Sequence, residues 1–338
     1  MPDPRLALAC VVARPDGGRR AREVARALLT GGDPEADPEV AAALDGRVAE
    51  VEAALARSGW RWLAAGEPGF PARLAAVADP PLGVFARGEL PAGRAVALVG
   101  ARRATAYGRE VAEYLGRELT EAGVSVVSGM ARGVDAAAHR GALAGGGRTV
   151  AVWGAGPDRV YPPEHDRLAE EIAASGCLLT EYPPGAPPLA HHFPERNRII
   201  AGLAEALVVV EADERSGALI TARLALDEGR EVLAVPGSVF SRLSAGPNGL
   251  LRAGAAPVLS ADDVLAVLGL PPRGAAAHGE DEPALLALLP AGEAVTVDHI
   301  AAASGQPVAR VLEGLLVLEL AGRVAREPDG RYRRRVSG

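Results

Sequence analysis

The fold is decided by three short apolar runs: AVALVG at Ala95–Gly100, VSVVSG at Val124–Gly129 and TVAVWG at Thr149–Gly154. Each run is continuously apolar and too short for a helix, which is typical of a parallel strand buried on both faces of a sheet. Between the first two runs, Gly108–Gly123 has apolar residues at helical spacing. Strand, loop and helix alternate, so the sequence predicts a doubly wound α/β domain with a mostly parallel sheet.

A loop of small and basic residues follows each strand. In this architecture, ligands bind beyond the carboxyl ends of the strands. Arg102 and Arg103 follow the first strand and precede a helix, where guanidinium and backbone N–H groups together hold a phosphate. Gly129 and Arg132 lie in the second loop. The sequence therefore predicts a phosphate- or nucleic-acid-binding crevice at this edge, with solvated loop charges as the alternative.

Composition limits the kind of protein this can be. The 338 residues are 49% hydrophobic, enough for two or three domains with real cores, and the net charge is −7. A nucleic-acid site must then be a local basic patch. Neither of the two cysteines has disulfide or metal-ligand spacing, and no apolar stretch approaches the roughly 20 residues that span a bilayer. We expect a cytoplasmic protein with no metal site and no membrane segment.

Upstream of the sheet, residues 1–68 have helical spacing at Arg22–Leu29 and Pro38–Ser58 and are predicted to form a small, SAM-like helical domain. Leu82–Ala86 is expected to be an edge strand. The α/β domain covers residues 69–270 and includes three further predicted strands: Cys177–Glu181, Ala206–Glu211 and Glu231–Gly237.

The C-terminal part has a different pattern. Residues 271–281 are rich in Pro, Gly and Ala and are expected to be a linker. In residues 282–338, Thr296 is a good N-cap for a second helix, and Pro307 starts a third. A turn at Pro328–Gly330 joins two short strands. Three helices followed by a hairpin predict a winged-helix domain.

Aromatic residues make up only 4% of the chain, yet Tyr161, Tyr182 and Phe193 all lie in loops on the crevice side. Next to basic loops, such side chains favour stacking on nucleic-acid bases. Core packing is the alternative for each of them.

Two sets of titratable residues could carry chemistry. Asp135 and His139 lie four residues apart on a predicted helix and could form an acid–base pair. We favour a helix cap and a hydrogen bond to a neighbouring loop, because no nucleophile with supporting geometry is evident. Glu181 and Glu211 end two strands, where they could act on a sugar, bind a metal, or pair with Arg196 or Arg198. Pairing is favoured.

Six motifs stand in a fixed order along the chain. They are VGARRATAYG (Val99–Gly108), SGMARGVDAAAHRGAL (Ser128–Leu143), GAGPDRVYPPEH (Gly154–His165), FPERNRIIAGL (Phe193–Leu203), SGALITARLA (Ser216–Ala225) and VPGSVFSRLSAGPNGLL (Val235–Leu251). Together they closely resemble the DNA-processing protein A family, also called DprA or Smf, over about residues 70–270. The helical and winged-helix segments look like optional modules of that family.

The resemblance implies an extended Rossmann-like domain that binds single-stranded DNA, forms a homodimer and loads RecA on incoming DNA in natural transformation. It implies no enzymatic activity and no cofactor. Pro163 and His165 depart from the family pattern, which has a basic residue and an Asn there. The residues expected to bind DNA by motif match are Gly100, Arg102, Arg103, Tyr107, Gly129, Arg132, Tyr161, Phe193, Arg196, Asn197 and Arg198.

Two other functions remain open at this point. Related Rossmann-like folds hydrolyse nucleotide N-glycosidic bonds, and Glu181, Glu211 and Thr221 could imitate such a site, although fold analogy alone supports this. A transcriptional regulator is suggested by the winged helix. Its third helix, however, offers a poor set for reading the major groove: Gln306, Arg310, Glu313 and Glu319.

Overall fold

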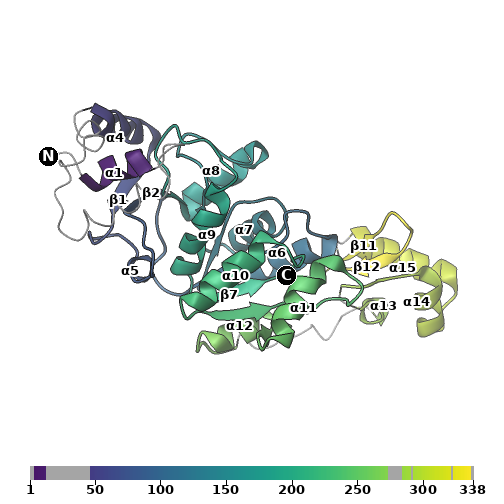
Figure 1. The fold of residues 1–338 in the computed structure, drawn as a ribbon. Helices are drawn as coiled ribbons and strands as arrows, with labels where there is room; N and C mark the ends of the chain where they lie inside the picture. The colour runs from purple at the N-terminus through teal and green to yellow at the C-terminus, as the bar shows by residue number, and fades with distance from the viewer. Residues whose placement is uncertain (1–3, 13–45, 273–283, 291, 321–322, 336–338) are drawn as a thin grey trace. The chain divides into compact units, whose positions relative to one another are not determined.

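The computed structural model describes residues 4–12, 46–272, 284–290, 292–320 and 323–335 (Figure 1). The chain divides into two compact units, residues 1–270 and 271–338. The helix expected at Arg22–Leu29, the first part of the one at Pro38–Ser58 and most of the expected linker lie outside the described residues.

A nine-stranded sheet forms the centre of the first unit, in the order β1-β2-β6-β5-β4-β3-β7-β8-β9. In this order, every strand from β6 through β5, β4, β3, β7 and β8 to β9 runs parallel to its neighbours in that series. In contrast, β2 pairs antiparallel with both β1 and β6. This confirms the predicted fold class. The strands are β1 Arg61–Ala64, β2 Gly83–Gly88, β3 Ala95–Val99, β4 Ser125–Ser128, β5 Thr149–Val152, β6 Cys177–Thr180, β7 Ala206–Val209, β8 Glu231–Ala234 and β9 Ala256–Pro257.

Helices cover both faces of the sheet, as alternate residues of β3 show. Ala97 and Val99 pack in a core with α5, α9 and α10, whereas Val96 and Leu98 pack with α6, α7 and α12. The helices are α1 Pro4–Val12, α4 Val48–Ser58, α5 Ala72–Ala75, α6 Ala106–Glu121, α7 Val134–Ala144, α8 Asp166–Ser175, α9 His192–Leu203, α10 Gly217–Asp227, α11 Ala245–Arg252 and α12 Ala261–Val267, with short 3₁₀ turns at Pro163–His165 and Arg242–Ser244.

The N-terminal residues share the core of the α/β domain. Leu6 of α1 and Val51 of α4 pack in one cluster with Met130, and Trp60 lies 5.4 Å from Trp153 between ring centroids. β1 also pairs with β2, so the predicted edge position of β2 is wrong. Of residues 1–68, expected to form a small helical domain, the described parts add strand β1 to the sheet and helices α1 and α4 to its core.

The second unit has the predicted winged-helix elements. Thr296 caps α14, because its hydroxyl accepts a hydrogen bond from the backbone N–H of His299 at 3.3 Å. A third, two-residue strand joins the predicted hairpin and was not anticipated. The elements are α13 Ala284–Ala287, β10 Ala294–Val295, α14 Val297–Ser304, α15 Val308–Leu320, β11 Val324–Arg326 and β12 Tyr332–Arg334.

Two glycines allow α6 and α7 to approach closely. A Cβ atom on Gly116 would lie 2.4 Å from the carbonyl oxygen of Ala138, and one on Gly141 would lie 2.0 Å from that of Glu113. Any side chain at either position would therefore push the helices apart. Among the helices in the described ranges, none is both long and apolar enough to cross a bilayer.

Candidate nucleic-acid interface

A small pocket lies at the carboxyl edge of the sheet, where the loops after β3, β4 and β5 meet the start of α9. Five of its lining residues were predicted to bind DNA, and they come from four of the sequence motifs. Ala131 and Pro162 complete the lining and were not predicted. The full set is Arg102, Gly129, Ala131, Arg132, Tyr161, Pro162 and Phe193.

Arg102, Tyr161 and Phe193 form a cationic and aromatic group in this pocket. The guanidinium carbon of Arg102 lies 5.2 Å from the ring centroid of Phe193, close enough for a cation–π interaction. The Tyr161 and Phe193 rings lie 5.3 Å apart between centroids at 41°. Tyr161 and Arg102 are exposed, and Phe193 is half-buried. The group can therefore offer ring surface to a base and positive charge to a phosphate.

Arg132 already has an anionic partner. It forms an ion pair with Glu164, and both side chains are about half exposed. The hydrogen bond from Arg132 holds the pKa of Glu164 below its ordinary value. An exposed pair of this kind contributes little to folding stability. Glu164 was missed because a single acidic residue in a Pro-rich loop has no distinctive pattern, but it lies where a phosphate would compete for Arg132.

The start of α6 does not offer the predicted phosphate site. Glu211 is buried, and its Oε2 accepts the backbone N–H of Thr105 at 2.9 Å. The Thr105 hydroxyl in turn accepts from the N–H of Gly108 at 3.0 Å. The anion position at this helix end is thus filled by the protein itself, and the expectation that Glu211 pairs with an arginine is wrong.

The other predicted residues near α6 do not line the pocket. Arg103 is exposed. The hydroxyl of half-buried Tyr107 donates to the carbonyl oxygen of Pro236 at 3.3 Å. A Cβ atom on Gly100 would lie 2.6 Å from the side chain of Val134, so this glycine allows close packing.

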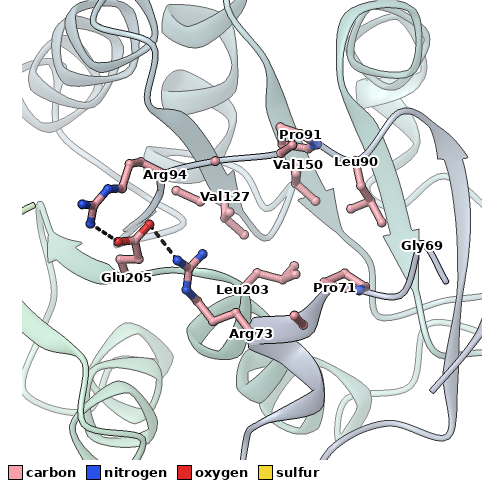
Figure 2. Close-up of a pocket in the computed structure, with 14 residues that line it drawn as sticks. Gly69, Pro71, Arg73, Leu90, Pro91, Arg94, Val127, Val150, Leu203 and Glu205 are labelled. Carbon is pink, nitrogen blue, oxygen red and sulfur yellow. Dashed lines mark hydrogen bonds and ion pairs between the residues drawn. The ribbon is translucent and has the colours of Figure 1, made fainter. Parts of the chain in front are cut away.

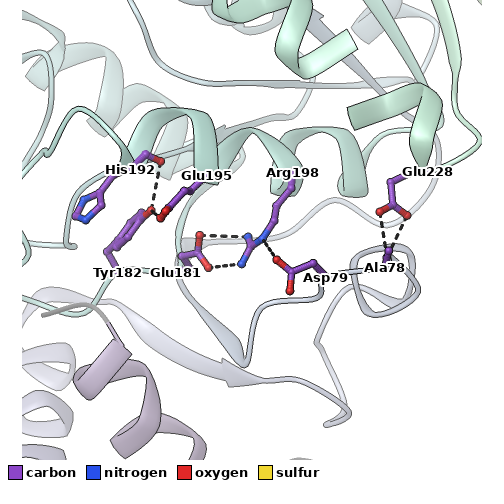
Figure 3. A network of polar contacts seen from close by, with 8 residues as sticks. All are labelled: Ala78, Asp79, Glu181, Tyr182, His192, Glu195, Arg198 and Glu228. Carbon is purple, nitrogen blue, oxygen red and sulfur yellow. Dashed lines mark hydrogen bonds and ion pairs between the residues drawn. The ribbon is translucent and has the colours of Figure 1, made fainter. Parts of the chain in front are cut away.

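The arginines of the FPERNR motif point into the protein, contrary to the expectation that they face DNA. Arg196 is 3% exposed and donates to the carbonyl oxygens of Gly129, at 2.8 Å, and Val152. Arg198 contacts both carboxylate oxygens of Glu181, at 2.6 and 3.2 Å, and also Asp79 at 3.2 Å (Figure 3). The predicted pairing of Glu181 is confirmed. Asn197 is half-buried on the same helix.

Arg198 belongs to a polar network that ties α9 to neighbouring segments (Figure 3). Burial lowers the pKa of Arg198, but Glu181 and Asp79 outweigh this and hold it above its ordinary value. Tyr182 is 5% exposed and stacks on His192 with centroids 3.9 Å apart, so the prediction that it stacks on bases is wrong.

Asp135 and His139 are both buried and bond to different partners. Asp135 does not cap α7; its Oδ2 accepts the N–H of Ala131 at 3.3 Å. Nδ1–H of His139 donates to the Thr149 hydroxyl at 2.7 Å, and that hydroxyl donates to the Val126 carbonyl at 2.8 Å. His139 thus forms a buried hydrogen bond as expected, but its partner belongs to strand β5 and not to a loop.

Burial shifts both of these pKa values. It raises the pKa of Asp135 to about 6, against the opposing effects of Arg196 and the N–H of Ala131. It lowers the pKa of His139 to about 3, helped by the nearby charges of His165, Arg196 and Arg140. His139 is thus neutral at ordinary pH.

A second hollow lies on the amino-terminal side of the sheet (Figure 2). Its walls are mostly aliphatic and include Leu90, Val150 and Leu203. Arg73 and Arg94 both bind one carboxylate there, that of Glu205, with Arg73 at 2.8 Å. The two guanidinium groups share this anion and no aromatic side chain lines the hollow, so its chemistry suits a nucleic-acid strand less well than the pocket at the carboxyl edge.

The fold and the pocket define an extended Rossmann-like protein with a winged-helix domain and an arginine–aromatic site at the carboxyl edge of its sheet. The profile of the family described as DNA recombination-mediator protein A matches residues 61–269, and that of the DprA winged helix domain matches residues 269–330. The chain therefore belongs to the DprA/Smf family.

Relatives cover most of the chain. It is 48% identical over 258 residues to a putative DNA processing protein DprA of Mycobacterium tuberculosis, covering 73% of this chain and 66% of that one. It is 41% identical over 283 residues to protein Smf of Escherichia coli, covering 79% and 75%.

Two solved structures are similar. That of DNA processing protein A from Streptococcus pneumoniae has a TM-score of 0.60 at 37% identity, covering 73% of this chain and 85% of that one. That of the Helicobacter pylori protein, described in terms of its single-stranded DNA binding mode, has a TM-score of 0.56 at 29% identity, covering 62% and 95%.

The buried His139 predicts a specific loss of stability in acid. Below pH 6.5 the unfolded chain takes up a proton at this residue, but the folded chain does so only near pH 3. Stability therefore falls as the pH drops between these values. Between pH 6.5 and 4.5 the free energy of unfolding of the wild type should fall by about 2 kcal/mol more than that of His139→Gln, as measured by urea unfolding.

Asp135→Asn provides the control of opposite sign. The folded pKa of about 6 lies above the ordinary value of 3.8, so Asp135 adds stability as the pH falls from 6 towards 3.8. Replacing Asp135 with Asn should therefore make the free energy of unfolding fall more steeply as the pH drops. Parallel pH profiles for the wild type and His139→Gln would contradict the assignment of a buried, neutral imidazole.

Proposed function

We propose that this chain binds single-stranded DNA in the pocket at the carboxyl edge and acts as a recombination mediator that loads RecA on incoming strands in natural transformation. The grouping of Arg102, Tyr161 and Phe193 carries this proposal. The Helicobacter pylori relative is described as binding single-stranded DNA, which supports the same ligand here.

The pocket chemistry favours single strands over duplex. Only an unstacked base can lay its face against an aromatic side chain, and stacking accepts any base. Arg102 and Arg132 add positive charge for the backbone. Because the whole chain carries −7, this attraction is local, and the remaining surface is free for protein partners.

The contacts of the candidate catalytic groups support binding rather than hydrolysis. Glu181 is held by Arg198 and Glu211 by Thr105, so neither carboxylate is left for a sugar or a water. Thr221 is 2% exposed and donates to the carbonyl oxygen of Gly217 at 3.2 Å. A nucleotide N-glycosidic hydrolase would need these groups accessible, and we therefore propose that the chain is not an enzyme.

The winged helix supports no role in reading duplex sequence. On α15, Val308, Leu312 and Leu316 are 44%, 42% and 55% exposed at a spacing of four residues. These three side chains cannot form the bidentate hydrogen bonds that identify bases, and Arg310 on the same helix is already paired with Glu313 at 3.5 Å. We also propose homodimers, because Val239 and Phe240 of the first unit are 83% and 96% exposed and offer apolar surface for self-association.

Two substitutions separate the electrostatic and stacking parts of the site. Arg102→Gln should weaken binding of an oligothymidylate about tenfold or more and flatten the salt dependence by roughly 0.7 in log–log slope, because one phosphate contact is lost. Phe193→Leu should weaken binding by a similar factor and leave that slope unchanged, because it removes a stacking surface but no charge. Fluorescence anisotropy across a salt series measures both quantities.

The matched control is Arg94→Gln, which removes the same charge on the amino-terminal side of the sheet. It should leave both affinity and slope unchanged. Equal losses in all three variants would mean that DNA responds to overall charge rather than to the pocket.

Glu164→Gln should have the opposite effect and bind the same oligonucleotide about threefold to tenfold more tightly. It releases Arg132 from its ion pair and removes a negative charge beside the expected phosphate position. The gain should shrink at high salt, and it should be smaller when Arg132 is also changed to Gln, because only the effect of the lost negative charge then remains. Weaker binding by the single variant would show that Glu164 helps to hold the site rather than competing with DNA.

The role as a mediator is tested with RecA from the same source. The chain should stimulate RecA ATP hydrolysis on single strands that are already coated with single-strand-binding protein, because holding DNA and RecA together raises their local concentration. Arg102→Gln should lose the stimulation and still retain RecA in a pull-down assay. Absence of stimulation by the intact chain at every ratio would refute the role, even if DNA binding were intact.

A further inference from the structure

The loop Gly129–Gly133 after β4 supplies Gly129, Ala131 and Arg132 to the pocket, and its backbone is unusual. Met130 has φ of 59°, the only positive φ at a non-glycine residue in the described ranges. This left-handed conformation is unfavourable for an ordinary side chain and persists only when surrounding contacts impose it. The Met130 side chain is fully buried, in a cluster with Trp60 and Trp153.

Three buried polar side chains from three different segments bond to the backbone of this loop. Asp135 of α7 accepts the N–H of Ala131 at 3.3 Å. Arg196 of α9 donates to the carbonyl oxygen of Gly129 at 2.8 Å. Nδ1–H of His165 donates to the carbonyl oxygen of Met130 at 2.9 Å. Buried side chains therefore hold two consecutive peptide groups of the loop, Gly129–Met130 and Met130–Ala131.

Gly129 lies between the two opposite charges. A Cβ atom at this position would lie 2.7 Å and 2.8 Å from the guanidinium nitrogens of Arg196 and 2.8 Å from Oδ2 of Asp135. The glycine thus leaves just enough space for both groups to reach the loop backbone. Asp135 and Arg196 are 8% and 3% exposed, so neither side chain is available to a DNA strand at the surface.

We propose that Asp135 and Arg196 are positioning residues, which hold the Gly129–Gly133 loop in the conformation with left-handed Met130. They would thereby present Arg132 to single-stranded DNA without touching the strand themselves. This inference rests on the proposed function of the pocket. It gives Arg196 a role different from the direct contact that its motif suggests. Removing either charge leaves the other buried without its opposite, so both changes should release the loop.

The sequence provides a selective probe of this loop. The chain has two methionines, Met1 and Met130, so ¹³C-methyl labelling of methionine gives a single internal NMR signal. That signal reports the loop conformation in the intact protein with or without DNA. Affinity for a labelled oligothymidylate is the second measurement, and the melting temperature monitors folding.

Arg196→Gln and Asp135→Asn should each shift the Met130 methyl signal and weaken DNA binding about tenfold. Arg196→Lys keeps the charge but loses the forked donor, and should give an intermediate result. The double variant should lose less binding free energy than the sum of the losses of the two single variants, because both residues act on one loop. Arg198→Gln, two residues along α9 and held by Glu181 and Asp79, should leave the methyl signal unchanged.

Weaker binding with an unshifted Met130 signal would overturn the proposal, since the residues would then act on DNA by another route. A shifted signal with unchanged affinity would overturn it too, because the loop position would not matter. If Arg196→Gln does not fold, Arg196→Lys and Asp135→Asn decide by the same two measurements. Failure of the wild type to bind DNA would instead refute the proposed function, and the methyl signal would still show whether these charges fix the loop.

Discussion

A permanently charged guanidinium group in the core imposes the constraint on which the binding edge depends. Arg196 cannot lose its proton at any ordinary pH, although burial lowers its pKa to about 10. It must therefore find acceptors inside the protein. The carbonyl groups at the ends of β4 and β5 provide them, which draws the loops after both strands onto α9. The pocket above these loops is a consequence of that arrangement.

Partners, rather than the number of arginines, determine where the chain can hold an anion. Arg198 is held by two carboxylates, and Arg73 and Arg94 share one on the other side of the sheet. Arg102 instead lies against an aromatic ring. A cation–π contact leaves a guanidinium with its charge and much of its hydrogen-bonding capacity. A protein with a net charge of −7 can in this way keep a locally cationic site.

Most of the fold could be predicted from the sequence, because continuous apolar runs identify buried parallel strands and their loops converge at one edge. The site was predicted only in part, because a motif does not show which side of a helix faces inwards. On α9, Arg196 is spaced three, four and seven residues from the buried Ile199, Ile200 and Leu203. That spacing marked Arg196 as a member of the inner face. The partner of Glu211 escaped prediction because Thr105 lies 106 residues away in the sequence. Strand β1 was also not predicted; it pairs with β2 across the intervening helix α5.

The buried charges near the pocket and the charges on its surface differ in how strongly water and salt screen them. Arg102 and Arg132 work in water, where salt weakens them and pH does not. Asp135 and Arg196 work without water, where each stabilises the other across the Gly129 backbone and is insensitive to salt. A binding site of this construction needs no group that titrates near neutrality on its surface. Asp135, whose pKa burial raises to about 6, is hidden from the surface and bonds to the backbone of a loop.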